Sequence, residues 1–491
     1  MLRDYTAHGG QRYLFDRDFT PVNAATRCTT LSPLSLCGHV SDTLKSQFVH
    51  ISCQLIAINF VLTWRQSGCD QAFGGCSLGS CFAVAGSGDG GTKMGHGCNN
   101  SSGRQCFLIM HILISAVSRF ESPTGICRHA ANLAQVLEAR PEIRRISFAT
   151  GTWQKGYYRD GLGLADSEKI KLLPISIRNN SLDRNMWFMR ELPRLSKAIA
   201  ADIVHLSFPV PITGRFFSCK TVVTVHDLYP YDIPENFGFP QVLLNRKFLR
   251  MAVTNADAIA CVSQTTLCRL CELFPKAQHK AVKIFNVVQP WRGIPRALEG
   301  LRFRCFVLTV AQHRQNKNLL LAVEGFEHLR QRGIVPRDSG LVIVGSSGPE
   351  TESLKQAIAE RQLQNSVQMA SAISEGELRW LYENCLLFMA TSSTEGFCLP
   401  LVEAMFAGCR IVCSDIPIFR EIGSSECAYF ELKQSPVEGL LSAARKVCEH
   451  ASRQHQTRAI EFSPEAIGAQ YSELYCKLVG RSSQEKIVEC H

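Results

Sequence analysis

The stretch from Glu395 to Cys413 reads EGFCLPLVEAMFAGCRIVC and has the pattern of a turn, a helix and a following strand. Pro400 suits the first turn of the helix, because proline lacks only an N–H that this turn leaves unpaired. Gly408 suits the C-terminal cap, and the apolar residues from Ile411 begin the next strand. The stretch therefore predicts a helix between two strands, the arrangement typical of parallel sheets.

Two carboxylates of this stretch, Glu395 and Glu403, are separated by seven residues. A helix N-terminus attracts anions, and a carboxylate beside it can accept hydrogen bonds from sugar or ribose hydroxyls. Gly396 has no Cβ and lets the backbone approach a ligand closely. The alternative interpretation is an ordinary surface turn and helix without a ligand.

The Glu-x7-Glu spacing in this setting resembles the donor-binding signature of the GT-B glycosyltransferases, specifically the retaining family-4, or group 1, enzymes. Other segments fit this family in the expected order from about residue 110 to about residue 479, but not in residues 1–109. The resemblance implies an α/β fold of GT-B architecture, with two Rossmann-like parallel-sheet domains that face a cleft. It also implies retaining transfer of a hexose such as mannose from a nucleotide-diphosphate sugar.

The bulk composition agrees with a globular chain that has more than one domain. Its 491 residues are 45% hydrophobic, and the net charge of +10 favours anionic partners such as nucleotide phosphates or lipid head groups. We expect no nucleic-acid partner, because this charge is moderate and spread along the chain. The first residues lack a signal-peptide pattern, and the 22 cysteines therefore indicate reduced thiols in the cytoplasm.

Four segments are expected along the chain. Residues 1–109 contain a stretch rich in Gly, Ser and Asn and are expected to be a poorly ordered extension, or to precede a true start at Met110. Residues 110–295 are predicted to form the acceptor-side domain and 296–460 the nucleotide-sugar domain. Residues 461–491 are predicted to form a helix that returns to the first domain, followed by a tail.

Strands and helices alternate after Met110, which predicts parallel sheets. The expected strands are Ile112–Val117, Thr221–Val225, Ala258–Val262, Phe306–Val310, Leu341–Val344, Leu387–Ala390 and Arg410–Ser414. The expected helices include Arg128–Glu138, Asn318–Arg330, Leu378–Glu383 and Pro464–Leu478.

Three patterns point elsewhere but lack the context that they need. Gly86, Gly88 and Gly91 have dinucleotide-binding spacing, but more glycines follow them where a helix is required. Asp16-Arg-Asp18 resembles a metal motif of another glycosyltransferase fold and lies outside any α/β unit. Cys268 and Cys271 form a CxxC pair without a second pair, so we interpret them as structural core and not as a zinc site.

The loop that precedes the predicted helix Asn318–Arg330 contains Arg314 and Lys317. A cation at a helix N-terminus opposes the helix dipole unless an anion lies between them, so Lys317 is predicted to bind a phosphate. The resemblance places Gly-Arg where this chain has Ala311-Gln312. Arg314 is a candidate replacement for the arginine that is missing at Gln312.

The resemblance assigns further donor-binding positions in the second half. Glu403 is the expected ribose ligand, and Glu395 is expected to contact the donor sugar. Gly396 and Phe397 would offer backbone N–H groups. Gly345, in a glycine turn after a strand, would line the nucleotide cleft.

The first half resembles the family in two places. Gly125 lies in a loop that opens a helix, as does the family's glycine loop that faces the donor diphosphate. His129 follows in that helix and is expected on the acceptor side. A simple helix cap by Ser122 or Thr124 is the alternative. His226 ends a strand where the family has a histidine that contacts the transferred sugar, and Asp227 would orient it or bind acceptor.

The resemblance implies a metal-independent reaction without a cofactor, in which His226, Lys317 and Glu395 are catalytic and the leaving diphosphate helps to deprotonate the acceptor. The acceptor would be a glycan or a lipid-linked glycan in polysaccharide or glycolipid biosynthesis, and the donor a GDP- or UDP-hexose. Between residues 177 and 197, basic residues alternate with large apolar ones, which suits either docking on the inner face of an anionic membrane or a solvated face over a core stripe.

Three alternatives stay open from the sequence. A nucleotide-sugar epimerase or a phosphorylase would share the fold. A binding protein could have kept the cleft and lost strong catalysis, as the change at Gln312 suggests. A dinucleotide oxidoreductase would depend on Gly86, Gly88 and Gly91.

Overall fold

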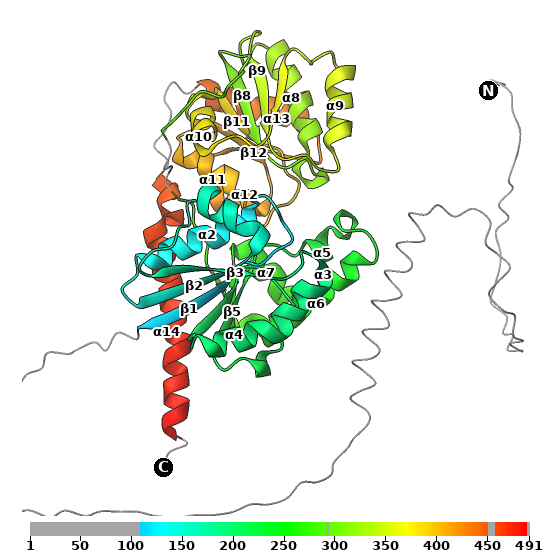
Figure 1. The fold of residues 1–491 in the computed structure, drawn as a ribbon. Coiled ribbons are helices and arrows are strands. Elements are labelled where there is room, and N and C mark those ends of the chain that lie inside the picture. The colour runs from blue at the N-terminus through cyan, green and yellow to red at the C-terminus, as the bar shows by residue number, and fades with distance from the viewer. Residues whose placement is uncertain (1–108, 290, 292–293, 450–456, 489–491) are drawn as a thin grey trace, which may run out of the picture. The chain divides into compact units, whose positions relative to one another are not determined.

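The computed structural model describes residues 109–289, 291, 294–449 and 457–488 (Figure 1). These residues belong to one compact unit, residues 101–491. The predictions made for residues 1–108, including the glycine fingerprint, the Asp-x-Asp motif and the proposed later start, lie outside the described residues.

The first domain is built on a seven-stranded sheet in which every strand pairs in parallel, in the order β3-β2-β1-β4-β5-β6-β7. Its strands are β1 (Met110–Ser115), β2 (Ile143–Gly151), β3 (Ile170–Ile175), β4 (Ile203–Leu206), β5 (Lys220–Val225), β6 (Ala258–Cys261) and β7 (Ala281–Lys283). Its helices are α2 (Gly125–Glu138), α3 (Ser181–Met186), α4 (Leu192–Ala198), α5 (Tyr229–Asp232), α6 (Gln241–Asn255) and α7 (Gln264–Leu273).

The second domain has a six-stranded parallel sheet in the order β10-β9-β8-β11-β12-β13. Its strands are β8 (Phe306–Val310), β9 (Gly340–Val344), β10 (Val367–Ala370), β11 (Leu387–Ala390), β12 (Ile411–Ser414) and β13 (Ala428–Phe430). Its helices are α8 (Leu319–Gln331), α9 (Thr351–Glu360), α10 (Glu375–Asn384), α11 (Leu399–Phe406), α12 (Pro417–Gly423) and α13 (Pro436–Glu449).

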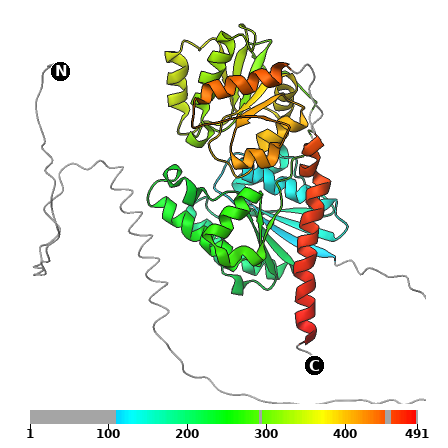
Figure 2. The ribbon, with the colours of Figure 1, turned by 180° about the vertical axis from the view of Figure 1, so that it is seen from behind.

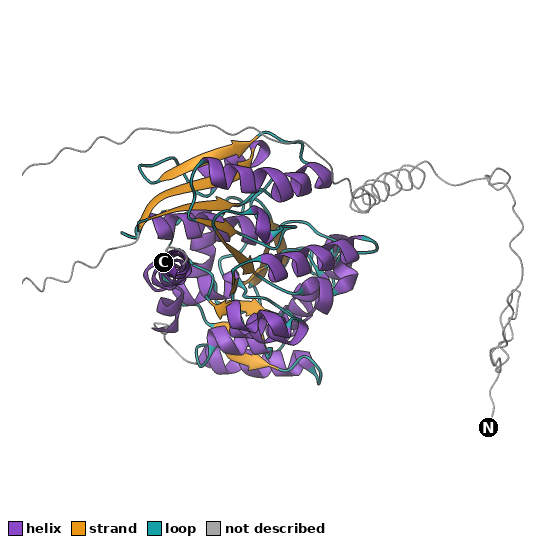
Figure 3. Ribbon diagram, turned by 90° about the horizontal axis from the view of Figure 1, so that it is seen from below, coloured by secondary structure: helices purple, strands orange, loops and turns teal. Residues whose placement is uncertain are grey.

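Both sheets reverse their strand order once, and this decides where a ligand can bind. The reversal lies between β1 and β4 in the first domain and between β8 and β11 in the second. The loops at the carboxyl ends of such neighbouring strands diverge and leave a crevice. Helices lie on both faces of the strands, as Figure 3 shows, so the strand ends carry the accessible polar groups.

The last helix, α14 (Pro464–Val488), returns to the first domain and packs against α2. Figure 2 shows it running beside the strands of that domain. Tyr475 is buried, and its hydroxyl shares a hydrogen bond of 2.7 Å with Nδ1 of His205 on β4. A Cβ on Gly468 would come within 2.6 Å of the side chain of Val136, so the two helices are in close contact.

The predicted parallel α/β fold is confirmed, and the strands Phe306–Val310 and Leu387–Ala390 match the expectation residue for residue. The first strand begins two residues earlier than predicted, at Met110, and α14 extends ten residues beyond Leu478. Among the described residues, no helix is both long enough and apolar enough to cross a bilayer.

Two interpretations of particular segments need comment. Cys268 is exposed, so its interpretation as structural core was wrong, and the described residues contain no group of three or more His, Cys, Asp or Glu that could hold a metal ion. In the basic stretch, Trp187, Phe188 and Leu192 are buried in the first domain. These three side chains therefore form a core stripe, whereas Leu182 in the same stretch is exposed.

Candidate functional site

Lys317 and Glu395 meet at the point where the second sheet reverses its strand order. Lys317 follows β8 and Glu395 follows β11, and Nζ of Lys317 lies 2.5 Å from Oε1 of Glu395. The side chains are 19% and 6% exposed. The hydroxyl of Ser392 donates to the same carboxylate oxygen at 2.8 Å. This ion pair is therefore held at the edge of the cleft by loops from the two central strands.

The backbone explains why Lys317 points there. A short 3-10 turn, Gln315–Lys317, is followed by Asn318 with a left-handed φ of 50°, which separates the lysine from α8. The hydroxyl of Thr391 donates to the carbonyl oxygens of Lys317 and Asn318, each at 3.0 Å. Lys317 was expected to need an anion near the helix start. In the structure that anion is Glu395.

Arg314 is the candidate replacement for the missing arginine. It is held by Gln312, the residue that occupies the position of that arginine. Its Nε donates to Oε1 of Gln312 at 2.8 Å. Arg314 is half-buried. Burial raises the pKa of Tyr229 in the first domain, and the charge of Arg314 acts in the opposite direction. Gln312 therefore orients a guanidinium toward the same cleft.

Breaking the contact between Gln312 and Arg314 should reduce turnover. We expect Gln312→Ala to lower kcat by about tenfold, because a hydrogen bond to a charged group contributes about 1.5–3 kcal/mol and part of this is lost when the guanidinium is free to move. Steady-state kinetics with a saturating donor would measure the effect. Gln315→Ala, which changes an exposed glutamine in the same loop, is the control. Equal rates for the two variants would contradict an orienting role for Gln312.

Gly396 allows a close approach, but between two parts of the protein. A Cβ at this position would lie 1.8 Å from the carbonyl oxygen of His226 and 3.3 Å from Cβ of Asp227. The sequence predicted that Gly396 lets a ligand approach the backbone. In the structure the close neighbour is the backbone of His226. Backbone contact between the two domains therefore requires glycine at this position.

His226 and His129 form an imidazole pair at the carboxyl end of the first sheet. Their ring centroids are 4.8 Å apart in an edge-to-face arrangement. Nε2 of His226 donates to the carbonyl oxygen of Ser207 at 2.9 Å, which leaves Nδ1 as the acceptor nitrogen. Burial lowers the pKa of His226 to about 4, so the ring is neutral at pH 7.

His129 is fully buried beside Asn286, whose side chain acts to raise its pKa, and neither ring nitrogen makes a hydrogen bond of regular geometry. Burial lowers its pKa well below the ordinary value, and the neighbouring rings of His226 and His205 lower it further. A buried polar group without a partner is costly. His129 is thus placed behind His226 and not on the open surface of the cleft.

Asp227 lies beside the Lys317–Glu395 pair. Burial raises the pKa of Asp227 to about 6, although the N–H of Tyr229, which donates to it at 3.1 Å, and the charge of Lys317 act in the opposite direction. Its carboxyl group can therefore exchange a proton close to neutral pH.

The stability of the first domain should depend on pH through its buried imidazoles. Burial lowers the pKa of His205 to about 3 and of His226 to about 4, below the ordinary value of 6.5, and the pKa of His129 is also depressed. Their stabilisation is present above pH 6.5 and is lost as the pH falls toward the folded-state pKa values, by on the order of 1 kcal/mol per histidine at pH 5.5. The raised pKa of Asp227 has the opposite effect on stability as the pH falls. Its contribution offsets somewhat less than the loss of stability from one histidine.

Urea unfolding at pH 7.5 and 5.5 would measure this change. We expect a net loss of about 3 kcal/mol in the wild type. His205→Gln keeps a side chain that can bond Thr224, and should show a loss smaller by on the order of 1 kcal/mol. An equal loss in both proteins would contradict this origin of the pH dependence.

Glu403, the expected ribose ligand, is already engaged in two contacts. The hydroxyl of Tyr382 donates to its Oε2 at 3.0 Å, and Nη1 of Arg128 on α2 lies 3.6 Å from its Oε1. Sequence analysis missed both partners. In the sequence, Arg128 lies between two predicted site residues, Gly125 and His129. This position was the only feature that could have indicated its role.

Tyr229 also escaped prediction, although it connects the two domains. Its hydroxyl donates to the carbonyl oxygen of Thr394 at 3.4 Å, and the amide of Asn316 donates to the same carbonyl at 3.2 Å. This tyrosine therefore ties the loop after β5 to the loop that carries Glu395. A tyrosine in the sequence Asp-Leu-Tyr-Pro has no pattern that would reveal such a role.

Three further predicted site residues, Gly125, Phe397 and Gly345, differ in what their surroundings leave available to a ligand. Gly125 is the first residue of α2, and Thr124 makes no side-chain cap there, so the simple helix-cap alternative fails for Thr124. The side chain of Phe397 is buried against Phe285 and Phe462, which leaves only its backbone for a ligand. At Gly345 a Cβ would lie 1.9 Å from the carbonyl oxygen of Ala311, so this glycine serves close packing of two loops.

Both domains contribute to a cavity of about 210 Å³ beside these groups. Its lining residues from the first domain include Asp227, Tyr229, Asp232, Thr266 and Arg269. From the second domain they include Ser393, Thr394, Glu395, Gly396 and Pro417. The cavity thus lies next to the predicted catalytic groups.

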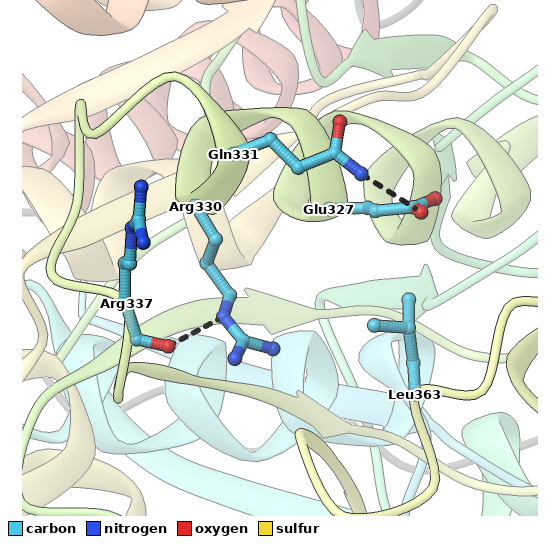
Figure 4. A pocket seen from close by; sticks show the side chains of 5 residues that line it. All are labelled: Glu327, Arg330, Gln331, Arg337 and Leu363. Carbon is cyan, nitrogen blue, oxygen red and sulfur yellow. Dashed lines mark hydrogen bonds between the residues drawn. The ribbon is translucent and has the colours of Figure 1, made fainter.

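A second cavity of about 400 Å³ lies away from these groups (Figure 4). It is lined by Glu327, Arg330, Gln331, Arg337 and Leu363, which belong to α8 and to the segments that lead into β9 and β10. Open α/β sheets bind ligands at the carboxyl ends of their strands. None of the predicted site residues lines this cavity, so we do not assign the site to it.

Two parallel α/β domains with polar loops from both sheets at one cavity define the GT-B class of fold. A family model described as "Glycosyl transferases group 1" matches residues 304–459, and one described as "Glycosyltransferase Family 4" matches residues 123–292. The chain belongs to the group 1 glycosyltransferases.

Individual proteins are similar over parts of the chain. The O-antigen chain mannosyltransferase RfbU of Salmonella typhimurium is 26% identical over 207 residues, which are 42% of this chain and 55% of that protein. The GDP-mannose:cellobiosyl-diphosphopolyprenol alpha-mannosyltransferase of Xanthomonas oryzae pv. oryzae is 34% identical over 119 residues, 24% of this chain and 31% of that protein. The matched parts thus span about half or less of these relatives.

Among solved structures, sucrose-phosphate synthase from Thermosynechococcus elongatus has a similar fold. The TM-score is 0.58 at 17% identity, over 76% of this chain and 100% of that one. This similarity concerns the fold alone.

Proposed function

We propose that the protein is a retaining hexosyltransferase that uses a nucleotide-diphosphate sugar, with mannose as the transferred sugar. The observation that carries the proposal is the Lys317–Glu395 pair at the strand reversal of the second sheet, beside a cavity that also contains Asp227 of the first domain. A cation for the departing phosphate and a carboxylate for sugar hydroxyls are the groups that this transfer needs.

Mannose and a guanosine nucleotide are supported by the relatives. RfbU is described as a mannosyltransferase of the O-antigen chain, and the Xanthomonas enzyme as using GDP-mannose and a diphosphopolyprenol-linked sugar. We therefore propose GDP-mannose before a UDP-hexose as donor, and a glycan or lipid-linked glycan as acceptor. Association with the inner face of an anionic membrane would follow from such an acceptor, and sedimentation with anionic liposomes would test it.

Each residue has a proposed task. Lys317, assisted by Arg314, stabilises the charge on the departing diphosphate, and the start of α2 at Gly125 faces it. Glu395 binds hydroxyls of the donor sugar, with the backbone N–H groups of Gly396 and Phe397 beside it.

The other groups of the site have supporting tasks. Glu403 contacts the ribose, and Gly345 lines the nucleotide side of the cleft. His226 contacts the transferred sugar through its free Nδ1, with His129 behind it and Asp227 on the acceptor side. We propose no metal in this reaction.

A binding protein with weak catalysis is the second candidate, because the chain has Gln312 where an arginine is expected. The contact between Arg314 and Gln312 favours the enzyme, since it provides a guanidinium two residues away. A dinucleotide oxidoreductase or an epimerase gains no support from the described residues.

The test uses the purified full-length chain with GDP-mannose, GDP-glucose, UDP-glucose and UDP-N-acetylglucosamine, each with and without EDTA. We expect release of GDP from GDP-mannose at a rate that EDTA leaves unchanged, and transfer with retention when an acceptor glycan is added. Tight nucleotide binding without release would favour the binding protein. Loss of the rate with EDTA would contradict the metal-free reaction.

A further inference from the structure

A carboxylate of the second domain caps a helix of the first domain. Glu421 lies on α12, and its Oε1 accepts a hydrogen bond from the backbone N–H of Gln264 at 2.6 Å. Its Oε2 accepts from the N–H of Thr265 at 3.0 Å and from the hydroxyl of Thr265 at 2.9 Å. Both donors lie in the first turn of α7.

The N-terminus of α7 is fully bonded as a result. Its N-cap residue, Ser263, accepts from the N–H of Thr266 at 3.0 Å. Residues adjacent in sequence normally provide such caps, but Glu421 lies more than 150 residues along the chain from these donors. The partial positive charge of the helix N-terminus strengthens bonds to a carboxylate. These bonds exist only while the two domains are in contact.

The position of Glu421 is itself held in place. Arg458 donates from Nη2 to the carbonyl oxygen of Glu421 at 2.7 Å and from Nε to that of Ile422 at 2.9 Å. Arg458 lies in the turn that leads into α14, the helix that returns to the first domain. The end of α12 is therefore connected to the first domain by α7 and by the segment before α14.

The contact borders the cavity of the candidate site. Thr265 and Pro417, from α7 and α12, line the same cavity as Asp227 and Glu395. The hydroxyl of Thr266 also donates to the carbonyl oxygen of Gly396 at 3.3 Å. A shift of α12 against α7 would consequently change the separation of the two loops.

We propose that Glu421 is a positioning residue that holds the donor-side pair, Lys317 and Glu395, in register with the acceptor-side loop of His226 and Asp227. It touches none of these groups and acts through α7. The assignment of donor and acceptor sides depends on the proposed function, whereas the contact between the domains does not.

Glu421→Ala in the full-length protein tests the proposal. Hydrogen exchange followed by mass spectrometry should show at least tenfold faster exchange of the backbone amides in the first turn of α7. With GDP-mannose as probe, turnover should fall about tenfold or more, while its dissociation constant should change less than threefold, because the second domain alone contains most of the donor-side groups.

Gln264→Pro is a matched variant from the other side of the contact. It removes one N–H bonded to Glu421 at the first helical position, where proline is well tolerated. The preceding Ser263 already has φ −158° and ψ 163°, the extended conformation that proline favours in the residue before it. This variant should show the same kinds of change in turnover and amide exchange, but smaller ones. The double variant should show no larger changes than Glu421→Ala alone. Glu438→Ala, which breaks an exposed ion pair with Arg332, is the control.

The outcomes separate this proposal from the proposed function. Unchanged amide exchange in Glu421→Ala, or fully additive effects in the double variant, would overturn the positioning role. Faster exchange of these amides together with non-additive effects on exchange would support it, even in a protein that transfers no mannose.

Discussion

Lys317→Ala should lower turnover by about 10²–10³, the largest loss that we expect from a single side chain of this protein. Its ammonium group lies at the edge of the cleft, where it is only 19% exposed, and faces the position proposed for the departing diphosphate. A preorganised cation in such a site stabilises developing charge more strongly than it would in water, and removal of one such contact typically costs this much.

The same substitution leaves Glu395 without its cation. The carboxylate is 6% exposed and retains the hydroxyl of Ser392 as a partner. An uncompensated buried charge destabilises the folded state by about 3–5 kcal/mol in comparable pairs. We therefore expect a lower melting temperature as well as the loss in kcat, and Lys317→Arg should recover stability better than turnover, because the fork of arginine does not fit a site built for a point charge.

Lys355→Ala provides the matched control. Its Nζ lies 2.9 Å from Glu352, but both side chains are largely exposed, and exposed pairs contribute at most about 1 kcal/mol. Steady-state kinetics and thermal unfolding of the three variants would complete the test. A folded Lys317→Ala protein with near-normal turnover would remove this lysine from the reaction.

Gly396→Ala should lower turnover by about 10² although it adds a single methyl group. The new Cβ would lie 1.8 Å from the carbonyl oxygen of His226, far inside van der Waals contact, so the two loops must separate by more than 1 Å. A displacement of about 1 Å between reacting groups can cost this much in rate. The contact of Thr266 with the carbonyl of Gly396 would be strained at the same time.

Gly156→Ala isolates the steric effect from the general effect of replacing glycine. Gly156 has φ −59°, and a Cβ there would meet nothing within 4 Å. We expect normal turnover for this variant and slower turnover for Gly396→Ala. If the two variants had the same activity, close contact between Gly396 and His226 would not be required.

The short-range features of the fold were predictable because they depend on local pattern. Apolar runs such as Phe306–Val310 and Leu387–Ala390 form buried strands as expected, and the positive φ of Gly408 agrees with its predicted role after a helix. The basic stretch near Trp187 was ambiguous because alternation of charge and apolar residues is compatible with a membrane and with a core. Only burial distinguishes the two.

The sequence by itself determined the parallel α/β architecture, the resemblance to group 1 glycosyltransferases and the positions of Lys317 and Glu395 at strand ends. The tertiary structure decided what these residues contact. It pairs Lys317 with Glu395, places the carbonyl oxygen of His226 against Gly396 and brings Glu421 to the start of α7. The physical reason is separation along the chain: these partners lie 78 or more residues apart, and no local periodicity encodes a contact over such a distance.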